Sequence, residues 1–172
     1  MFFRKPVPTF RHHALFARFF GRPEPMLTEA GPRDAAALAT LHGASFRRGW
    51  SEDEFERLLL DRGVLAHRAT LGQRPVGFII SRIAAGEAEI LSVAVARAQQ
   101  GRGLARRLLD LHLRRLAGLG VRTVFLEVDD DNVPARRLYA RSAFHQVGRR
   151  DGYYSRPGNA SAAALVLRRD LG

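Results

Sequence analysis

The chain has no cysteine among its 172 residues, so disulfide bonds, thiolate metal sites and a cysteine nucleophile are excluded. No run of about 18 apolar residues occurs either, which argues against a membrane-spanning helix. The absence of cysteine is typical of a reducing compartment, and we expect a cytoplasmic protein. Hydrophobic residues make up 46% and charged residues 26%, a composition that predicts a single globular domain.

Acidic residues are also scarce, because 17 aspartates and glutamates stand against 28 lysines and arginines, for a formal net charge of +11. Such a surface attracts polyanions such as coenzyme phosphates, ribosomal RNA or acidic lipids, although it can equally be a solvated arginine-rich surface. No interleaved basic and aromatic motif of the RNA-binding kind accompanies the charge. Direct nucleic-acid binding is therefore not required, and the sequence predicts no oligomeric state.

Residues 1–25 are basic and rich in phenylalanine, with no acidic residue before Glu24. We expect a flexible extension here, or an upstream sequence before a true start at Met26, and a folded domain over residues 26–172. An alternative is a short helix over residues 10–20 that rests its phenylalanines on a membrane surface.

From Met26 onward, hydrophobic periodicity predicts strands alternating with helices. Strands are expected over residues 26–29, 64–70, 75–82, 87–95, 121–128, 144–149 and 162–167, and helices over 33–46, 52–60, 103–117 and 133–142. Ser51 and Asn132 are the expected N-caps of the second and the last helix. In the first helix, the residues expected to reach the core are Ala36, Leu38, Leu41 and Phe46. The order predicts an α/β (α+β) domain.

A strand, a glycine-rich turn and a helix start follow one another over residues 93–106. The free backbone N–H groups and the dipole at a helix start favour an anion. Gly101 and Gly103 let the main chain approach a bulky phosphate without a Cβ between them, and Arg102 and Arg106 add positive charge. These residues predict a phosphate-binding turn.

Three kinds of phosphate-binding loop compete for this turn. A P-loop requires a Lys-Ser/Thr pair, which is absent, and a dinucleotide fingerprint requires a small residue where Arg106 stands. The turn Gln100-x-x-Gly103-x-Ala105 instead resembles the Gln/Arg-x-x-Gly-x-Gly/Ala pyrophosphate loop of the GNAT acyltransferases.

A second segment carries the resemblance further. It reads Leu126-Glu127-Val128, then Asn132-x-x-Ala135-x-x-Leu138-Tyr139, then Ala143-Phe144, and it is followed by Arg150-Asp151-Gly152-Tyr153-Tyr154. With Trp50-Ser51 and the strand 88–95 upstream, these motifs resemble the ribosomal-protein-alanine N-acetyltransferases, the RimI-like branch of GNAT, over about residues 26–167. Two residues depart from the family pattern: Ala105 and Ala143 each stand where glycine is common, and Ala143 is expected to be strained at its helix end.

The resemblance implies a GNAT fold, which is a mixed, mostly antiparallel sheet of six to seven strands, splayed at the coenzyme site and flanked by about four helices. It also implies acetyl-CoA as the acetyl donor. Glu127 matches the family's proton acceptor, with Glu89 as the other candidate base or as a ligand of the incoming ammonium. The alternative for Glu127 is an ion pair with a neighbouring arginine and no catalytic role. Tyr139 matches the family's proton donor to the departing thiolate, a role that a phenol can fill because it is protonated at neutral pH. The alternative for Tyr139 is an aromatic residue that only packs.

The same resemblance assigns the residues that bind the coenzyme. Val93, Ala94 and Val95 would pair their backbone with the pantetheine arm, Gly101, Arg102, Gly103, Leu104, Ala105 and Arg106 would wrap the pyrophosphate, and Asn132 would bond the coenzyme. No metal is predicted, because the histidines lack ligand spacing and are expected to be surface or packing residues.

The function implied is acetylation of a protein N-terminal α-amine, most specifically the N-terminal alanine of a small-subunit ribosomal protein. Trp50, Tyr153 and Tyr154 would help to form the peptide groove. Other protein N-termini, lysine side chains and small amines are alternative acceptors. A non-catalytic acyl-coenzyme-binding module is a further alternative, against which the presence of both Glu127 and Tyr139 speaks.

Overall fold

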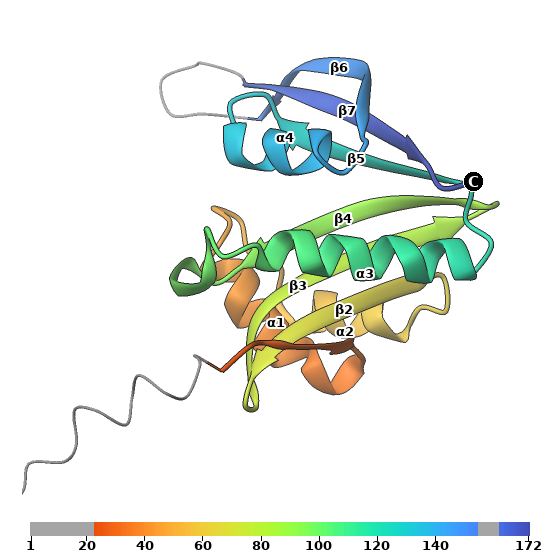
Figure 1. Cartoon of the computed structure of the whole chain (residues 1–172). Helices are drawn as coiled ribbons and strands as arrows, with labels where there is room; N and C mark the ends of the chain where they lie inside the picture. The colour runs from red at the N-terminus through yellow and green to blue at the C-terminus, as the bar shows by residue number, and fades with distance from the viewer. Residues whose placement is uncertain (1–22, 155–161) are drawn as a thin grey trace, which may run out of the picture.

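The computed structural model describes residues 23–154 and 162–172, and within them one sheet of seven strands is flanked by four α-helices (Figure 1). The strands are β1 (Met26–Glu29), β2 (Val64–Leu71), β3 (Arg74–Ala84), β4 (Glu87–Val95), β5 (Thr123–Asp129), β6 (His145–Tyr154) and β7 (Ala162–Asp170). The helices are α1 (Ala35–Gly43), α2 (Glu52–Leu60), α3 (Leu104–Gly118) and α4 (Val133–Ala140).

The strands lie in the order β1-β2-β3-β4-β5-β7-β6, and every neighbouring pair is antiparallel except β4 with β5. The β4–β5 ladder joins residues 87–90 to residues 123–126, although β4 continues to Val95 and β5 to Asp129. The two strands therefore separate beyond Ile90 and Leu126, and Figure 1 shows them diverging. The expected splayed, mixed and mostly antiparallel sheet is confirmed.

Each face of the sheet has its own apolar core. Helices α1 and α2 cover one face, where Leu38 and Phe55 pack with Phe78. Helices α3 and α4 cover the other face, where Leu108 and Tyr139 belong to the second core. The splay, where β4 and β5 separate, therefore faces two opposite sides of the sheet.

Most predicted elements are confirmed within one to three residues, but β6 extends five residues beyond its expected end at residue 149, and the first helix is shorter than expected. A 3-10 turn over Pro32–Asp34 precedes α1, and the helix ends at Gly43 rather than at residue 46. The placement of Ala36 and Phe46 in the core was wrong. Ala36 is exposed, and Phe46, 41% exposed beyond the helix end, stacks on His42 instead.

The expected caps are confirmed. Ser51 Oγ accepts a hydrogen bond from the Glu54 backbone N–H at 3.2 Å, and the Glu54 carboxylate accepts one from the Ser51 N–H at 2.7 Å. Asn132 Oδ1 accepts a hydrogen bond from the Ala135 N–H at 3.2 Å and so caps α4. Both helices thus begin where their cap residues predict.

Three buried polar side chains join α3 to the sheet. His67 Nδ1 and His112 Nδ1 lie 2.8 Å apart, and His112 Nε2 lies 2.7 Å from Ser81 Oγ. Burial lowers the pKa of His112 to about 3, and the neighbouring His67 adds to this shift. A neutral imidazole donates from one ring nitrogen and accepts at the other, so two neutral histidines can make both contacts. Both histidines therefore act as packing residues at neutral pH.

Ala143, three residues beyond the end of α4, has a left-handed conformation with a φ of +59°, as its place in the glycine position of the motif led us to expect. A left-handed alanine costs about 1 kcal/mol relative to glycine. We expect Ala143→Gly to raise the melting temperature by about 2–4 °C in thermal denaturation. Ala37→Gly, at an exposed position inside α1, should instead destabilise the fold by about 1 kcal/mol. Equal effects of the two variants would contradict this account.

The prediction for the N-terminal extension lies mostly outside the described residues, since the structure describes the chain from residue 23. The helix considered over residues 10–20 therefore stays a prediction. Among the residues described, no helix is both long enough and apolar enough to cross a membrane.

Candidate functional site

A cavity of about 810 Å³ opens between the start of α3 and helix α4, on the side of the sheet that these helices cover. We call it the α3–α4 cavity. Its walls are the end of β4, the glycine turn and one side of α4. The lining residues are Val93, Val95, Gln99, Gln100, Gly101, Gly103, Leu104, Ala105, Arg106, Asn132, Pro134, Ala135, Arg137, Leu138, Tyr139 and Arg141. Because β5 has left β4 at this level, no strand of the described part of the chain pairs with the β4 backbone on this side.

The glycine turn presents its backbone to this cavity. Gly101 and Gly103 have φ values of +72° and +76°, a region that residues with a Cβ rarely adopt. A Cβ built on either residue would meet no atom within 4 Å, so the space beside both is open. The Gln100 side chain ties the turn to the strand by donating from Nε2 to the Val95 carbonyl at 3.0 Å. The arrangement leaves helix-start N–H groups available to an anion.

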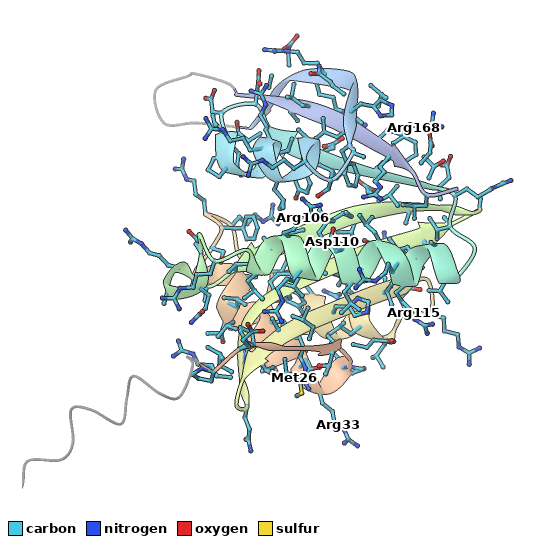
Figure 2. The ribbon with its side chains drawn as sticks, viewed as in Figure 1. Met26, Arg33, Arg106, Asp110, Arg115 and Arg168 are labelled. Carbon is cyan, nitrogen blue, oxygen red and sulfur yellow. The ribbon has the colours of Figure 1, made fainter. Side chains whose placement is uncertain are left out.

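Arginines on both helices give the cavity a positive rim. Figure 2 shows Arg106 beside Asp110 on α3, and the pair is joined by an ion pair of 3.0 Å. Arg137 and Arg141 line the cavity from α4 and were missed by sequence reasoning, although their spacing of four residues places them on one helical side. Arg102 does not line the cavity and instead donates to Gln99 Oε1 at 3.3 Å. Three arginines thus surround a site suited to phosphates.

Two further predicted residues reach this cavity from α4. Asn132 lines it while its side-chain oxygen caps the helix. Tyr139 is 7% exposed and packs edge-on against Phe144, with 5.7 Å between ring centroids. This packing fixes the phenol against the wall of the cavity.

Ala94 is predicted in the same group but turns the other way. Its side chain is buried in the core beneath α1 and α2, whereas Val93 and Val95 face the α3–α4 cavity. Alternation along a strand explains this difference. Any contact of Ala94 with a ligand in the cavity would therefore be made by its backbone.

Glu127 and Glu89 lie on the opposite side of the sheet, in a separate pocket of about 390 Å³ that we call the Glu127 pocket. The Glu127 carboxylate is 17% exposed and forms an ion pair of 3.0 Å with Nη1 of Arg150, a residue of β6 that is 60% exposed. Glu89 is exposed and stands inside the paired part of β4, opposite Phe125. Glu127 directly follows Leu126, the last residue of β5 that pairs with β4. Of the two acids, only Glu127 therefore lies where the two strands separate.

Trp50 lines a third pocket, of about 310 Å³, next to the start of α2. Its backbone N–H donates to His42 Nδ1 at 3.0 Å, and the two rings stack with centroids 4.6 Å apart. Burial lowers the pKa of His42, an effect that the Glu54 carboxylate partly opposes. Arg82 lines both this pocket and the Glu127 pocket, so the two are adjacent. The side chains of Tyr153 and Tyr154 lie outside the described residues, and their expected role stays a prediction.

The structure therefore brings the predicted residues together from two sides of one splayed strand pair. The glycine turn, Asn132 and Tyr139 surround the α3–α4 cavity, and Glu127 faces the other side at the same level of the sheet. The geometry suits transfer between two substrates that enter from opposite faces.

Known proteins share this architecture and sequence pattern. A protein named ribosomal protein bS18-alanine N-acetyltransferase, from Haemophilus ducreyi, is 32% identical over 92 residues, 54% of this chain and 63% of that protein, which is less than two thirds of its length. A mycothiol acetyltransferase from Mycobacteroides abscessus is 34% identical over 139 residues, 73% of this chain and 47% of that protein.

In three dimensions the chain is similar to the crystal structure of the ribosomal-protein-S18-alanine N-acetyltransferase from Escherichia coli. The TM-score is 0.80 at 24% identity, with 86% of this chain and 94% of that chain covered, so the likeness is one of fold. The family model described as the acetyltransferase (GNAT) family matches residues 35–144, which is more than half of the chain. The chain belongs to the GNAT acetyltransferase family.

Proposed function

We propose that this protein transfers an acetyl group from acetyl-CoA to the N-terminal α-amine of a protein, with the N-terminal alanine of a small-subunit ribosomal protein as its acceptor. The single observation that carries the proposal is the two-sided site. A large cavity with an open glycine turn lies on one face of the splay, and a carboxylate lies on the other. The name of the Haemophilus relative supports the choice of acceptor.

The α3–α4 cavity has the size and the chemistry that acetyl-CoA requires. Its volume of about 810 Å³ falls within the usual range for ligand sites of roughly 300–1,000 Å³. The open space beside Gly101 and Gly103 would accept the pyrophosphate, with Arg106, Arg137 and Arg141 nearby. The unpaired end of β4 would hold the pantetheine arm by backbone hydrogen bonds, as a further strand would.

Acyl transfer needs a neutral amine, whereas a protein N-terminus has a pKa near 8 and is mostly an ammonium at pH 7. In our proposal the Glu127 carboxylate accepts a proton from this ammonium, directly or through one water. The amine nitrogen then attacks the thioester carbonyl carbon, the C–S bond breaks as the amide forms, and the nitrogen loses its second proton to water. The thiolate takes its proton from the Tyr139 hydroxyl, and later exchange with solvent restores both groups.

Arg150 positions the Glu127 carboxylate in this proposal. The ion pair between them positions the carboxylate at the splay before an acceptor arrives. Because Arg150 is 60% exposed, water screens the pair and an incoming ammonium can displace the guanidinium at small cost. The pair is thus compatible with a base that is ready to accept a proton.

The coenzyme half of the proposal predicts a large effect of filling the glycine turn. We expect Gly103→Val to weaken acetyl-CoA binding by about tenfold or more in calorimetry, because the branched side chain would occupy the phosphate space and push the phosphate away from the backbone N–H groups. Gly72→Val is the matched control, since Gly72 has a φ of +58° and open space but lies in the β2–β3 turn. Equal acetyl-CoA affinity in both variants would argue against the loop assignment.

The acceptor half is tested by thiol release from acetyl-CoA in the presence of N-terminal peptides. Peptides that begin with alanine, glycine, serine or methionine would be compared with an Nα-acetylated peptide that carries one free lysine, and with small primary amines. We expect the alanine peptide to exceed the lysine peptide by about tenfold or more in kcat/KM. Preference for a small amine would instead favour an acceptor outside proteins, an alternative that the mycothiol acetyltransferase relative supports.

A further inference from the structure

Ser92 of β4 has a side chain that the fold does not use. In the chain as described, its Oγ is the one buried side-chain nitrogen or oxygen without a hydrogen-bond partner, and the residue is 8% exposed. Buried hydroxyls are nearly always paired, because an unpaired one loses its bonds to water without replacement. An unpaired hydroxyl beside a candidate active site therefore needs an explanation.

A β-bulge sets the direction of Ser92. The β3–β4 register joins Ser81 to Ile90 but Ile80 to Ser92, so Leu91 is an extra residue in β4. Ser92 thereby shares the face of Ile80, which belongs to the core beneath α1 and α2. Without the bulge, Ser92 would lie on the same face as Ile90 and point toward α3. The bulge thus turns the hydroxyl toward the acceptor side.

Ser92 and Glu127 both lie just beyond the paired part of the two diverging strands. The ladder between β4 and β5 ends at Ile90 and Leu126, and Glu127 is the next residue of β5. Leu91 and Ser92 are the next residues of β4, and Glu127 shares their side of the sheet because Leu126 packs in the opposite core. Ser92 also directly precedes Val93, which lines the α3–α4 cavity.

We propose that Ser92 binds the acceptor amine, its Oγ accepting a hydrogen bond from the primary ammonium or amine that enters between β4 and β5. The inference rests on the proposed function and assigns a second polar contact to its acceptor site. Glu127 approaches the nitrogen from β5 and Ser92 from β4, which orients the nitrogen lone pair toward an acyl carbon held beside Val93. The unpaired hydroxyl of the free protein is then paired in the complex.

The test compares Ser92→Ala with Ser81→Ala, a change of the same size at a fully buried serine of the neighbouring strand. Peptide kinetics at saturating acetyl-CoA, acetyl-CoA calorimetry and thermal denaturation would be measured for both. We expect Ser92→Ala to raise the peptide KM about five- to tenfold, to leave acetyl-CoA affinity unchanged, and to keep or raise the melting temperature. Ser81→Ala should leave the peptide KM unchanged and lower the melting temperature by about 2–4 °C, because it breaks the bond to His112.

The outcomes separate this inference from the proposed function. Wild-type protein that acetylates peptides, together with a Ser92→Ala variant of equal peptide KM, would overturn the role of Ser92 alone. A rise in acetyl-CoA dissociation constant with no change in peptide KM would also overturn it, since the hydroxyl would then serve the donor. If no peptide or amine of the panel causes the wild-type protein to release thiol, the proposed function is overturned, and the acceptor role of Ser92 with it.

Discussion

Replacing Glu127 with glutamine is expected to lower kcat/KM for an alanine N-terminal peptide by about 100- to 1,000-fold at pH 7, the usual contribution of a general base. Glutamine preserves the shape of the side chain but cannot take a proton from the ammonium. The loss should shrink as pH rises past the amine pKa near 8, because solvent then supplies the neutral amine. Initial rates from pH 6 to pH 9.5 measure both effects.

Glu89→Gln is the matched control for this variant, because both acids line the same pocket. Glu89 lies within the paired part of β4, before the splay, and is exposed. We therefore expect its replacement to change kcat/KM by about threefold or less, as befits a residue without proton transfer. A larger loss in Glu89→Gln than in Glu127→Gln would reverse the assignment of the base.

A purely structural role of Glu127 predicts a different result. Its described ion pair is with an exposed arginine, so its loss should change stability by less than about 1 kcal/mol. Arg150→Gln removes the same pair while leaving the carboxylate in place. If the pair itself mattered, both variants would lose activity equally, whereas a base at Glu127 predicts that Arg150→Gln keeps most of the activity.

Local patterns in the sequence were sufficient to predict much of this molecule. The period of the apolar residues gave β1 and β4 with their observed ends, and Ser51 and Asn132 marked two helix starts. The glycine turn could be predicted equally well, since glycine itself permits the positive φ found at Gly101 and Gly103. Each of these features depends on neighbours within a few positions of the chain.

Features that depend on the order and register of strands could not be predicted in this way. The Glu127–Arg150 pair spans the sheet across β7, which lies between β5 and β6 only in the folded order. The bulge at Leu91 contains no glycine or proline that would indicate it in the sequence, yet it decides which face Ser92 occupies. The prediction for the end of the first helix was wrong for a similar reason, because the ring of Phe46 packs on His42 from beyond the helix.

Tyr139→Phe is expected to lower kcat by on the order of 100-fold while changing the acetyl-CoA dissociation constant by less than about twofold. The phenol would protonate the departing thiolate, and phenylalanine keeps the ring but lacks the proton. Packing should survive, since the ring contact with Phe144 is retained. Single-turnover kinetics with saturating acetyl-CoA, together with calorimetry, separate the chemical step from binding.

Tyr139→Ala distinguishes this acid from an aromatic that only packs. Truncation of a ring that is 7% exposed should destabilise the fold by about 3 kcal/mol, whereas Tyr139→Phe, which keeps the ring, should lower the melting temperature much less. If the tyrosine only packs, activity must follow stability, and the phenylalanine variant will turn over like the wild type. If it is the acid, the phenylalanine variant folds normally and is slow, because only the hydroxyl at the wall of the α3–α4 cavity has been removed.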